Sequence, residues 1–225
     1  MAVSPYTLLD RANEHGASLI LYQRGTEFSI FVEREGELMN SRMHNSEDVL
    51  AELACSHIAK RKAPRLLVGG LGMGFTLRAA LNHSRDDAKV IVSELIPAVV
   101  RWNREYMGGL ADYPLNDTRV DVLEMDVGKV MQKHKKTYDA IMLDVDNGPD
   151  GFTREDNDAL YGYNGLYAAY ASLTAGGILT VWSSASDKAF TQRLNKVGFE
   201  VTEHTVHSQK GKRGHRHHIW VGIKS

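Results

Sequence analysis

The segment Arg65–Phe75, with the sequence RLLVGGLGMGF, places four glycines directly after a short apolar run. Leu66–Val68 carries no charge, which is typical of a strand buried on both faces. Thr76–Leu81 then has the composition of a helix. Strand, glycine turn and helix together can bring backbone N–H groups and a helix N-terminus up to a polar ligand. A tight turn that binds nothing could use the same glycines, so this motif alone leaves both interpretations open.

Downstream of the glycine motif, strand-like and helical segments alternate, which predicts an α/β fold with a parallel sheet covered by helices. Strands are expected at residues 66–68, 89–94, 119–126, 138–144, 178–182, 199–206 and 217–223. The last two are joined by a short loop, so we expect them to pair antiparallel.

The segment before the glycine motif has a different pattern. Short strands at residues 18–23, 27–32 and 37–40, with turns between them, predict a small antiparallel meander. Asn45 is the expected N-cap of the helix that follows, with acidic residues in its first turn. We therefore expect two parts: residues 1–62 with the meander and a connecting helix, and residues 63–225 with a Rossmann-like domain.

Composition limits the classes of protein that fit. The formal net charge of −1 argues against extensive binding to nucleic acids or to membrane surfaces. Cys55 is the single cysteine, which rules out an internal disulfide and fits a reducing compartment. No apolar run approaches the roughly 20 residues that span a bilayer, and the N-terminus lacks the pattern of a signal peptide. We expect a cytoplasmic protein.

Acidic residues follow successive predicted strands at the edge where ligands bind in α/β sheets. Glu94 lies 20 residues beyond Gly74, where a carboxylate can accept both hydroxyls of a ribose. Asp126 ends the next strand and could accept from an adenine amino group, and Asp144 ends the one after. Each acid could instead be a helix N-cap or a solvated loop residue.

Taken with the glycines Gly70, Gly72 and Gly74, these acids predict an adenosine-shaped cleft. Two cofactors fit it, a nicotinamide dinucleotide and S-adenosylmethionine. The antiparallel strand pair at the C-terminus favours S-adenosylmethionine.

Over roughly residues 18–222, the sequence resembles the spermidine synthase group of S-adenosylmethionine-type transferases. The resemblance rests on the N-terminal strands and on the motifs at 65–78, 92–95, 119–126, 138–149, 160–161 and 176–177. It implies a class I methyltransferase sheet with strand order 3-2-1-4-5-7-6, a small N-terminal antiparallel β appendage and a homodimer.

The resemblance also implies roles for individual residues. The loop Gly70–Gly74 would pack against the cofactor, Glu94 would hold the ribose and Asp126 the adenine. Asp144 would contact the cofactor and face the reacting amine as general base or electrostatic anchor, and Asp146 corresponds to a second acid of the same loop. No metal site is expected. The implied cofactor is S-adenosylmethionine or its decarboxylated form.

Three departures from the family pattern concern the group that is transferred. Met73 and Ala79 stand where the family has an aspartate and a glutamate, and Asp48-Val49 stands where it has a Tyr-His pair. A diamine carries two charges and needs carboxylates to replace its water. We therefore expect methyl transfer to a small-molecule acceptor. Aminopropyl transfer to a polyamine is the alternative; an NAD-dependent oxidoreductase and a binding protein without catalysis are further ones.

The run His207–His218 is rich in histidine and basic residues. If it reached the cleft it could attract an anionic substrate, but a solvated hairpin tip is the simpler interpretation. His215 and His217 would share a strand face, yet two imidazoles without a further ligand are a weak sign of a metal site.

Overall fold

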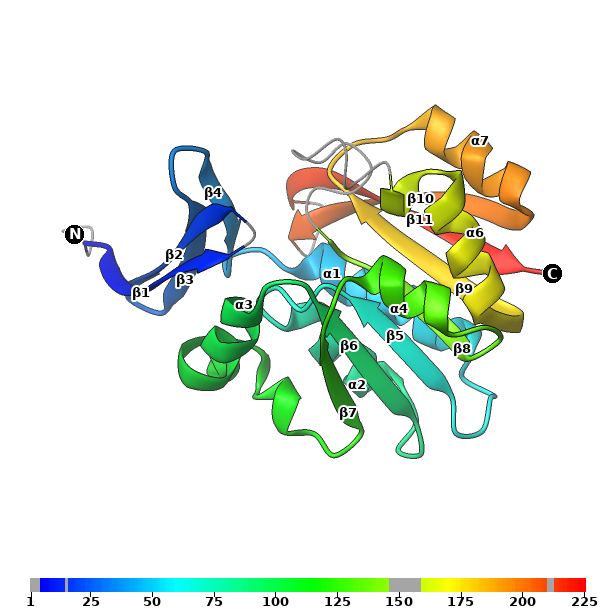
Figure 1. The fold of residues 1–225 in the computed structure, drawn as a ribbon, viewed down its shortest axis with the longest axis horizontal. Helices are drawn as coiled ribbons and strands as arrows, with labels where there is room; N and C mark the ends of the chain where they lie inside the picture. The colour runs from blue at the N-terminus through cyan, green and yellow to red at the C-terminus, as the bar shows by residue number, and fades with distance from the viewer. Residues whose placement is uncertain (1–4, 15, 146–158, 210–212) are drawn as a thin grey trace.

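The computed structural model describes residues 5–14, 16–145, 159–209 and 213–225, and these form two sheets. A small N-terminal sheet stands to one side of a larger sheet that carries helices on both faces (Figure 1). The α/β class and the central, mainly parallel sheet are thus confirmed.

The N-terminal sheet is an antiparallel meander of four strands, β1 (Thr7–Glu14), β2 (Ala17–Arg24), β3 (Glu27–Val32) and β4 (Gly36–Asn40). The sequence predicted only the last three. β1 has no regular alternation of apolar and polar residues, and two of its acids have partners on another element. The Asp10 carboxylate accepts from Trp102 Nε1 at 2.7 Å, and Glu14 accepts from the backbone N–H of Ala98.

The larger sheet has the strand order β10-β11-β9-β8-β5-β6-β7. Its strands are β5 (Arg65–Gly69), β6 (Lys89–Glu94), β7 (Val120–Glu124), β8 (Tyr138–Leu143), β9 (Leu173–Ser183), β10 (Phe199–Gln209) and β11 (Arg213–Lys224). The first five along the chain are parallel, while β11 is antiparallel to both β9 and β10. Numbered from β5, this is the expected order 3-2-1-4-5-7-6.

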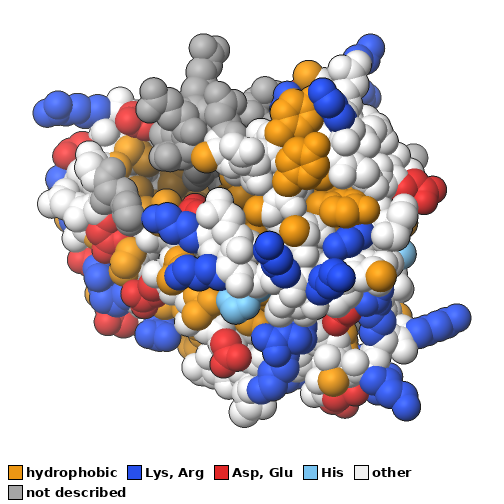
Figure 2. Space-filling view, turned by 45° about the vertical axis from the view of Figure 1, so that its right-hand side comes forward, with side chains coloured by type: hydrophobic (Ala, Val, Ile, Leu, Met, Phe, Trp, Pro, Cys, Tyr) orange, Lys and Arg blue, Asp and Glu red, His pale blue; other side chains and the backbone are white. Residues whose placement is uncertain are grey.

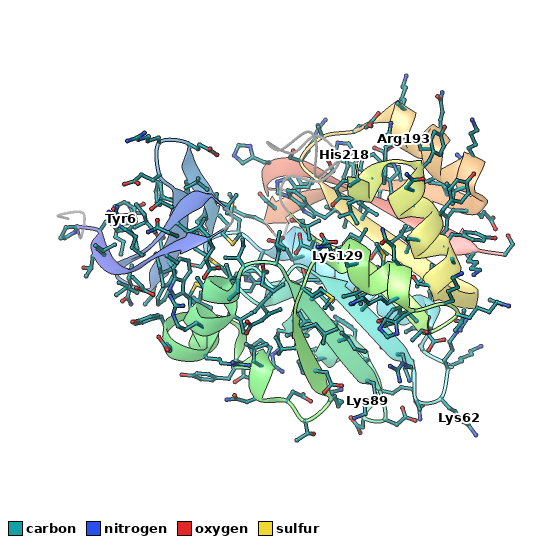
Figure 3. The ribbon with its side chains drawn as sticks, viewed as in Figure 1. Tyr6, Lys62, Lys89, Lys129, Arg193 and His218 are labelled. Carbon is teal, nitrogen blue, oxygen red and sulfur yellow. The ribbon has the colours of Figure 1, made fainter. Side chains whose placement is uncertain are left out.

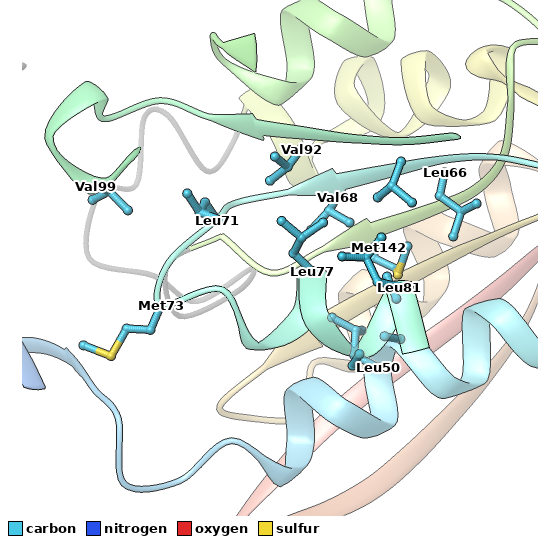
Figure 4. Packing of buried hydrophobic residues seen from close by; sticks show 14 of the residues in the cluster. Leu50, Leu66, Val68, Leu71, Met73, Leu77, Leu81, Val92, Val99 and Met142 are labelled. Carbon is cyan, nitrogen blue, oxygen red and sulfur yellow. The ribbon is translucent and has the colours of Figure 1, made fainter. Parts of the chain in front are cut away.

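Helices cover the two faces of this sheet and enclose two apolar clusters. On one face lie α1 (Asn45–His57), α2 (Phe75–His83) and α3 (Pro97–Trp102); on the other lie α4 (Val127–Lys133), α6 (Tyr163–Ser172) and α7 (Lys188–Val197). After α3 the chain forms a π-helical turn, η1 (Asn103–Met107), and two 3₁₀ turns, η2 (Gly108–Ala111) and η3 (Pro114–Asn116). Leu50, Leu66 and Leu77 pack together between the sheet and its helices (Figure 4).

Helix α1 begins one residue earlier than predicted. His44, not Asn45, is the N-cap residue, and its side chain makes no capping hydrogen bond. The amide of Asn45 instead donates to the backbone carbonyl of His207 at 2.7 Å, which ties the start of α1 to the end of β10. Because α1 packs on α2 and β9, it lies over the larger sheet. The division between residues 62 and 63 stays a prediction.

In the described ranges, no helix is both long and apolar enough to cross a bilayer. One face of the molecule carries many Lys and Arg side chains with acidic side chains between them (Figure 2). The chain as a whole is close to neutral, so positive charge is local.

Candidate functional site

The glycine loop lies between β5 and α2, at the carboxyl edge of the parallel strands. Gly70 has a φ of +88°, and a Cβ there would collide with the carbonyl oxygen of Asp144. Gly74 also has a φ of +88° and is the N-cap of α2, where a Cβ would lie 3.1 Å from Pro114 Cγ. Gly72 has a φ of +49°. The loop therefore needs glycine both for its backbone conformation and for close approach to neighbouring chain segments.

Glu94 lies at the end of β6 and is 8% exposed. Its carboxylate accepts from the backbone N–H of Leu71 at 2.8 Å and of Gly72 at 3.4 Å, and from Ile96 N–H at 2.9 Å. It thereby fixes the glycine loop to β6, a role that sequence reasoning missed. A carboxylate has about four lone-pair sites, so these bonds are compatible with ribose hydroxyls as further partners.

Asp126 caps helix α4. Its Oδ1 accepts from the backbone N–H of Lys129 at 2.8 Å, and the residue is partly exposed. Lys129 lies at the carboxyl edge of the sheet, whereas Lys62 and Lys89 lie at the opposite edge (Figure 3). The N-cap interpretation of Asp126 is thus observed, and its assignment to adenine stays a prediction. The glycine loop, Glu94 and Asp126 are called the glycine-loop side below.

Asp144 directly follows β8 and lies against the glycine loop. Its backbone N–H donates to Gly69 O at 2.8 Å, and its Oδ2 accepts from Thr76 Oγ1 at 2.5 Å. Burial raises the pKa of Asp144, although the Thr76 hydrogen bond lowers it. The side chain is therefore held in a poorly solvated place by the first turn of α2.

A second carboxylate lies near Asp144 and was not predicted. Glu47, in the first turn of α1, has its pKa raised to about 8 by burial and by the charge of Asp144. Ser46 Oγ donates to Glu47 Oε2 at 2.6 Å and lies 2.9 Å from His217 Nδ1. Helix-start acids are common in sequences, so no signal distinguished Glu47 from Asp48. Asp144, Glu47, Ser46 and His217 are called the α1 side.

The strand register explains why His217 reaches this place. Within β11, Ile219 pairs with Trp182 of β9, and His217 packs edge-on against the Trp182 ring with centroids 4.7 Å apart. His218 points to β10 instead, with Nδ1 2.7 Å from Glu203 Oε1. The histidine run is therefore divided: one member joins the site and another pairs with its neighbouring strand. The described residues contain no metal-ligating group of three.

Met73 and Ala79 are both in the apolar core. They are 5% and 4% exposed and belong to the cluster that includes Leu71 and Leu77. Met73 extends from the glycine loop away from α2 (Figure 4). These two positions thus have a packing role in this chain, so their lack of charge does not report on the transferred group.

The structure brings Gly70, Asp144 and Glu94 to one edge of the sheet, with Asp126 at the start of the neighbouring α4. Asp146 lies outside the described residues. Glu47, Thr76 and His217 add side chains on which sequence reasoning had placed no role in the site.

Comparison with known proteins gives three kinds of match. The family model described as the spermine/spermidine synthase domain matches residues 44–194, about two thirds of the chain. Two curated relatives, polyamine aminopropyltransferases of Thermoanaerobacter sp. (strain X514) and Thermoanaerobacter pseudethanolicus (strain ATCC 33223 / 39E), are each 33% identical over 79 residues. That match covers 35% of this chain and 27% of each relative, so it spans about a quarter of their length.

Two solved structures share the fold. A spermidine synthase crystallised with the transition-state analogue AdoDATO matches with a TM-score of 0.76 and 16% identity, covering 97% of this chain and 72% of that one. The spermidine synthase of Thermotoga maritima matches with a TM-score of 0.77 and 17% identity, covering 97% and 73%.

The expected methyl transfer is wrong on these findings. The family model and the curated relatives support aminopropyl transfer, the alternative. The error came from giving weight to Met73 and Ala79, which are core residues here. The expected homodimer stays a prediction.

Proposed function

Because the chain belongs to the spermine/spermidine synthase family, we propose that it transfers an aminopropyl group from decarboxylated S-adenosylmethionine to a polyamine. The observation that carries the proposal is the family match across residues 44–194, which include the glycine loop and the acids that end three successive strands. The curated relatives, polyamine aminopropyltransferases, support the same reaction.

The residues of the glycine-loop side fit an adenosine-containing donor. Gly70 and Gly74 lack side chains at two points of close approach, and the backbone of the loop lies along the site edge. Glu94 would accept the ribose hydroxyls while it holds the loop N–H groups, and Asp126 would accept from the adenine amino group. The bound cofactor supplies a carbon activated by a sulfonium.

The α1 side fits the acceptor. An amine attacks only after its nitrogen has lost a proton and has been aligned with the reacting carbon. Asp144, which Thr76 holds at 2.5 Å, would orient the amine. Since both Asp144 and Glu47 are acids in a poorly solvated place, a cationic acceptor supplies the positive charge that they lack.

The test is product formation by the purified full chain. We expect spermidine and 5′-methylthioadenosine, detected by mass spectrometry, from decarboxylated S-adenosylmethionine and putrescine. Asp144→Asn should lower the rate by about 100-fold or more, the usual contribution of a positioned acid–base group. Absence of thioether release with a panel of diamines and triamines would refute the proposed reaction.

A further inference from the structure

Three side chains from two distant parts of the sequence form a hydrogen-bonded chain on the α1 side. Ser46 is fully buried, and its Oγ lies 2.6 Å from Glu47 Oε2 and 2.9 Å from His217 Nδ1. When the Ser46 hydroxyl donates its single hydrogen to an ionised Glu47, the Nδ1–H of His217 is the group that can donate to Ser46. Burial lowers the pKa of His217, which favours a neutral ring with one N–H.

Glu47 differs from an ordinary acid in the first turn of a helix. Such acids are common because a negative charge near a helix N-terminus is favourable at the surface. Glu47 is partly buried, and burial together with the charge of Asp144 raises its pKa to about 8. The protein therefore places a carboxylate where it is costly to ionise, and uses a buried serine to hold it.

Within the described ranges, neither Glu47 nor Asp144 forms an ion pair with a lysine or arginine. The ion pairs of those ranges involve other acids, and no metal-ligating group of three occurs there. Two carboxylates that repel each other at a site edge favour a cation from outside the chain. Under the proposed function, the cation that reaches this site is the primary ammonium of the acceptor.

We propose that Glu47 binds the ammonium of the acceptor and takes its proton, with Ser46 and His217 as positioning residues. This inference rests on the proposed function. The ammonium gives one proton to Glu47, and the freed nitrogen lone pair forms the C–N bond. The C–S bond of the donor breaks and its electron pair stays on sulfur. The product carries the new charge as a secondary ammonium, and Glu47 returns its proton to water.

The first experiment measures proton release on binding, which needs no turnover. Putrescine is titrated into the full chain by calorimetry at pH 7 in two buffers of different ionisation enthalpy. With a pKa of about 8, Glu47 is protonated in roughly nine molecules of ten and must ionise to pair with the ammonium. We expect Glu47 to release about 0.9 proton per site in the wild type. Glu47→Gln should lose this release and keep only the contribution of Asp144, whose pKa is also raised by burial.

Glu52→Gln is the matched control, because it makes the same change at an exposed position of the same helix. It should release protons like the wild type. Equal release by Glu47→Gln and the wild type would overturn the proposal, and so would the absence of putrescine binding to the wild type.

Ser46→Ala tests the positioning role. The titratable groups around Glu47 are Asp144 at the end of β8, Asp48 on α1 and His217 on β11. The Ser46 hydrogen bond lowers the pKa of Glu47, so its removal should move the pH profile of proton release to higher pH. An unchanged profile in the folded variant would refute the positioning role.

The product assay separates this inference from the proposed function. If putrescine binding releases protons but no aminopropyl group is transferred, the binding role of Glu47 is supported and the proposed reaction is refuted. If Glu47→Gln transfers the aminopropyl group at the wild-type rate, the proposed reaction is supported and the role of Glu47 is refuted. We expect instead a rate lowered about 100-fold or more in this variant.

Discussion

Glu94 and Asp126, on the glycine-loop side, accept hydrogen bonds from backbone N–H groups, which come from Leu71, Gly72 and Ile96 for Glu94. Backbone donors cannot titrate, and they are fixed by the strands and helices that carry them. The oxygens of such a carboxylate are therefore held in place by the fold itself.

The α1 side is built differently. Glu47 and Asp144 accept from side-chain hydroxyls, and burial raises the pKa of both. The comparison teaches that one edge of the sheet can hold carboxylates fixed by backbone donors beside carboxylates held by hydroxyls, whose pKa values are raised by burial. The same substitution, Glu to Gln, should therefore have opposite effects on stability on the two sides.

The largest loss of stability is expected from a substitution at Gly70, where the glycine-loop side meets the α1 side. Gly70→Ala adds a Cβ that collides with the Asp144 carbonyl at a φ of +88°. The loop and the end of β8 must both move, so we expect a loss of about 3 kcal/mol or more in the free energy of unfolding, measured with urea.

Gly25→Ala is the control for backbone strain alone. Gly25 has a φ of +62° and no atom within 4 Å of a built Cβ, so we expect a loss of about 1 kcal/mol. Similar losses in the two variants would show that the contact with Asp144 contributes nothing.

Glu94→Gln should destabilise the protein. The variant keeps one acceptor oxygen, but its amide NH₂ would face backbone N–H groups that now have no acceptor. We expect a loss of about 2 kcal/mol at pH 7, the scale of hydrogen bonds to a charged group, from urea unfolding. Glu52→Gln is exposed and should change stability by less than about 0.5 kcal/mol. If Glu94→Gln has the same free energy of unfolding as the wild type, the hydrogen bonds of Glu94 do not stabilise the glycine loop, and the contrast between the two sides is lost.

Glu47→Gln should stabilise the protein at high pH, whereas Glu94→Gln destabilises it. The pKa of Glu47 is raised from 4.5 to about 8, so between these values the folded state binds more protons than the unfolded state. The free energy of unfolding of the wild type therefore falls as pH rises through this window. The variant has no carboxyl group at this position, so its stability does not fall in this way. We expect it to be about 2 kcal/mol more stable than the wild type at pH 8.5 and similar to it at pH 4. Urea unfolding at both pH values measures this, and a parallel pH dependence of the two proteins would contradict it.

The glycine-loop side could be predicted from the sequence because its parts are local. A buried strand, its glycines and an acid at the end of the next strand lie within 30 residues, and parallel strands bring their ends to one edge. The strand order followed from the family resemblance rather than from the pattern. β1 was missed because its polar residues pair with α3, far along the chain.

The α1 side could not be predicted in the same way. Ser46 and His217 are 171 positions apart, and nothing in either segment indicates the other. Glu47 and Asp48 look alike in the sequence, and only the packing of α1 over the sheet decides which of them interacts with Asp144. The missing acid at Met73 was visible in the sequence, whereas the interaction of Glu47 with Asp144 from another element was not.

The smallest effect separates the two roles of Asp126. As an N-cap it needs one oxygen, which accepts from Lys129 N–H. As a contact for adenine it needs a second acceptor. Asp126→Asn keeps the first oxygen and replaces the second with an NH₂ donor, so helix α4 should stay capped and stability should change by less than about 0.5 kcal/mol.

The affinity of Asp126→Asn for 5′-methylthioadenosine should nevertheless fall by about tenfold, because the new NH₂ group would face the amino group of the adenine, a donor opposite a donor. Calorimetry measures this, and Asp126→Ala serves as the reference that loses the cap and about 1 kcal/mol of stability. If Asp126→Asn binds the nucleoside as tightly as the wild type, Asp126 is a cap alone. The glycine-loop side would then recognise the adenosine through Glu94 and the loop backbone, without a side-chain acceptor for the base.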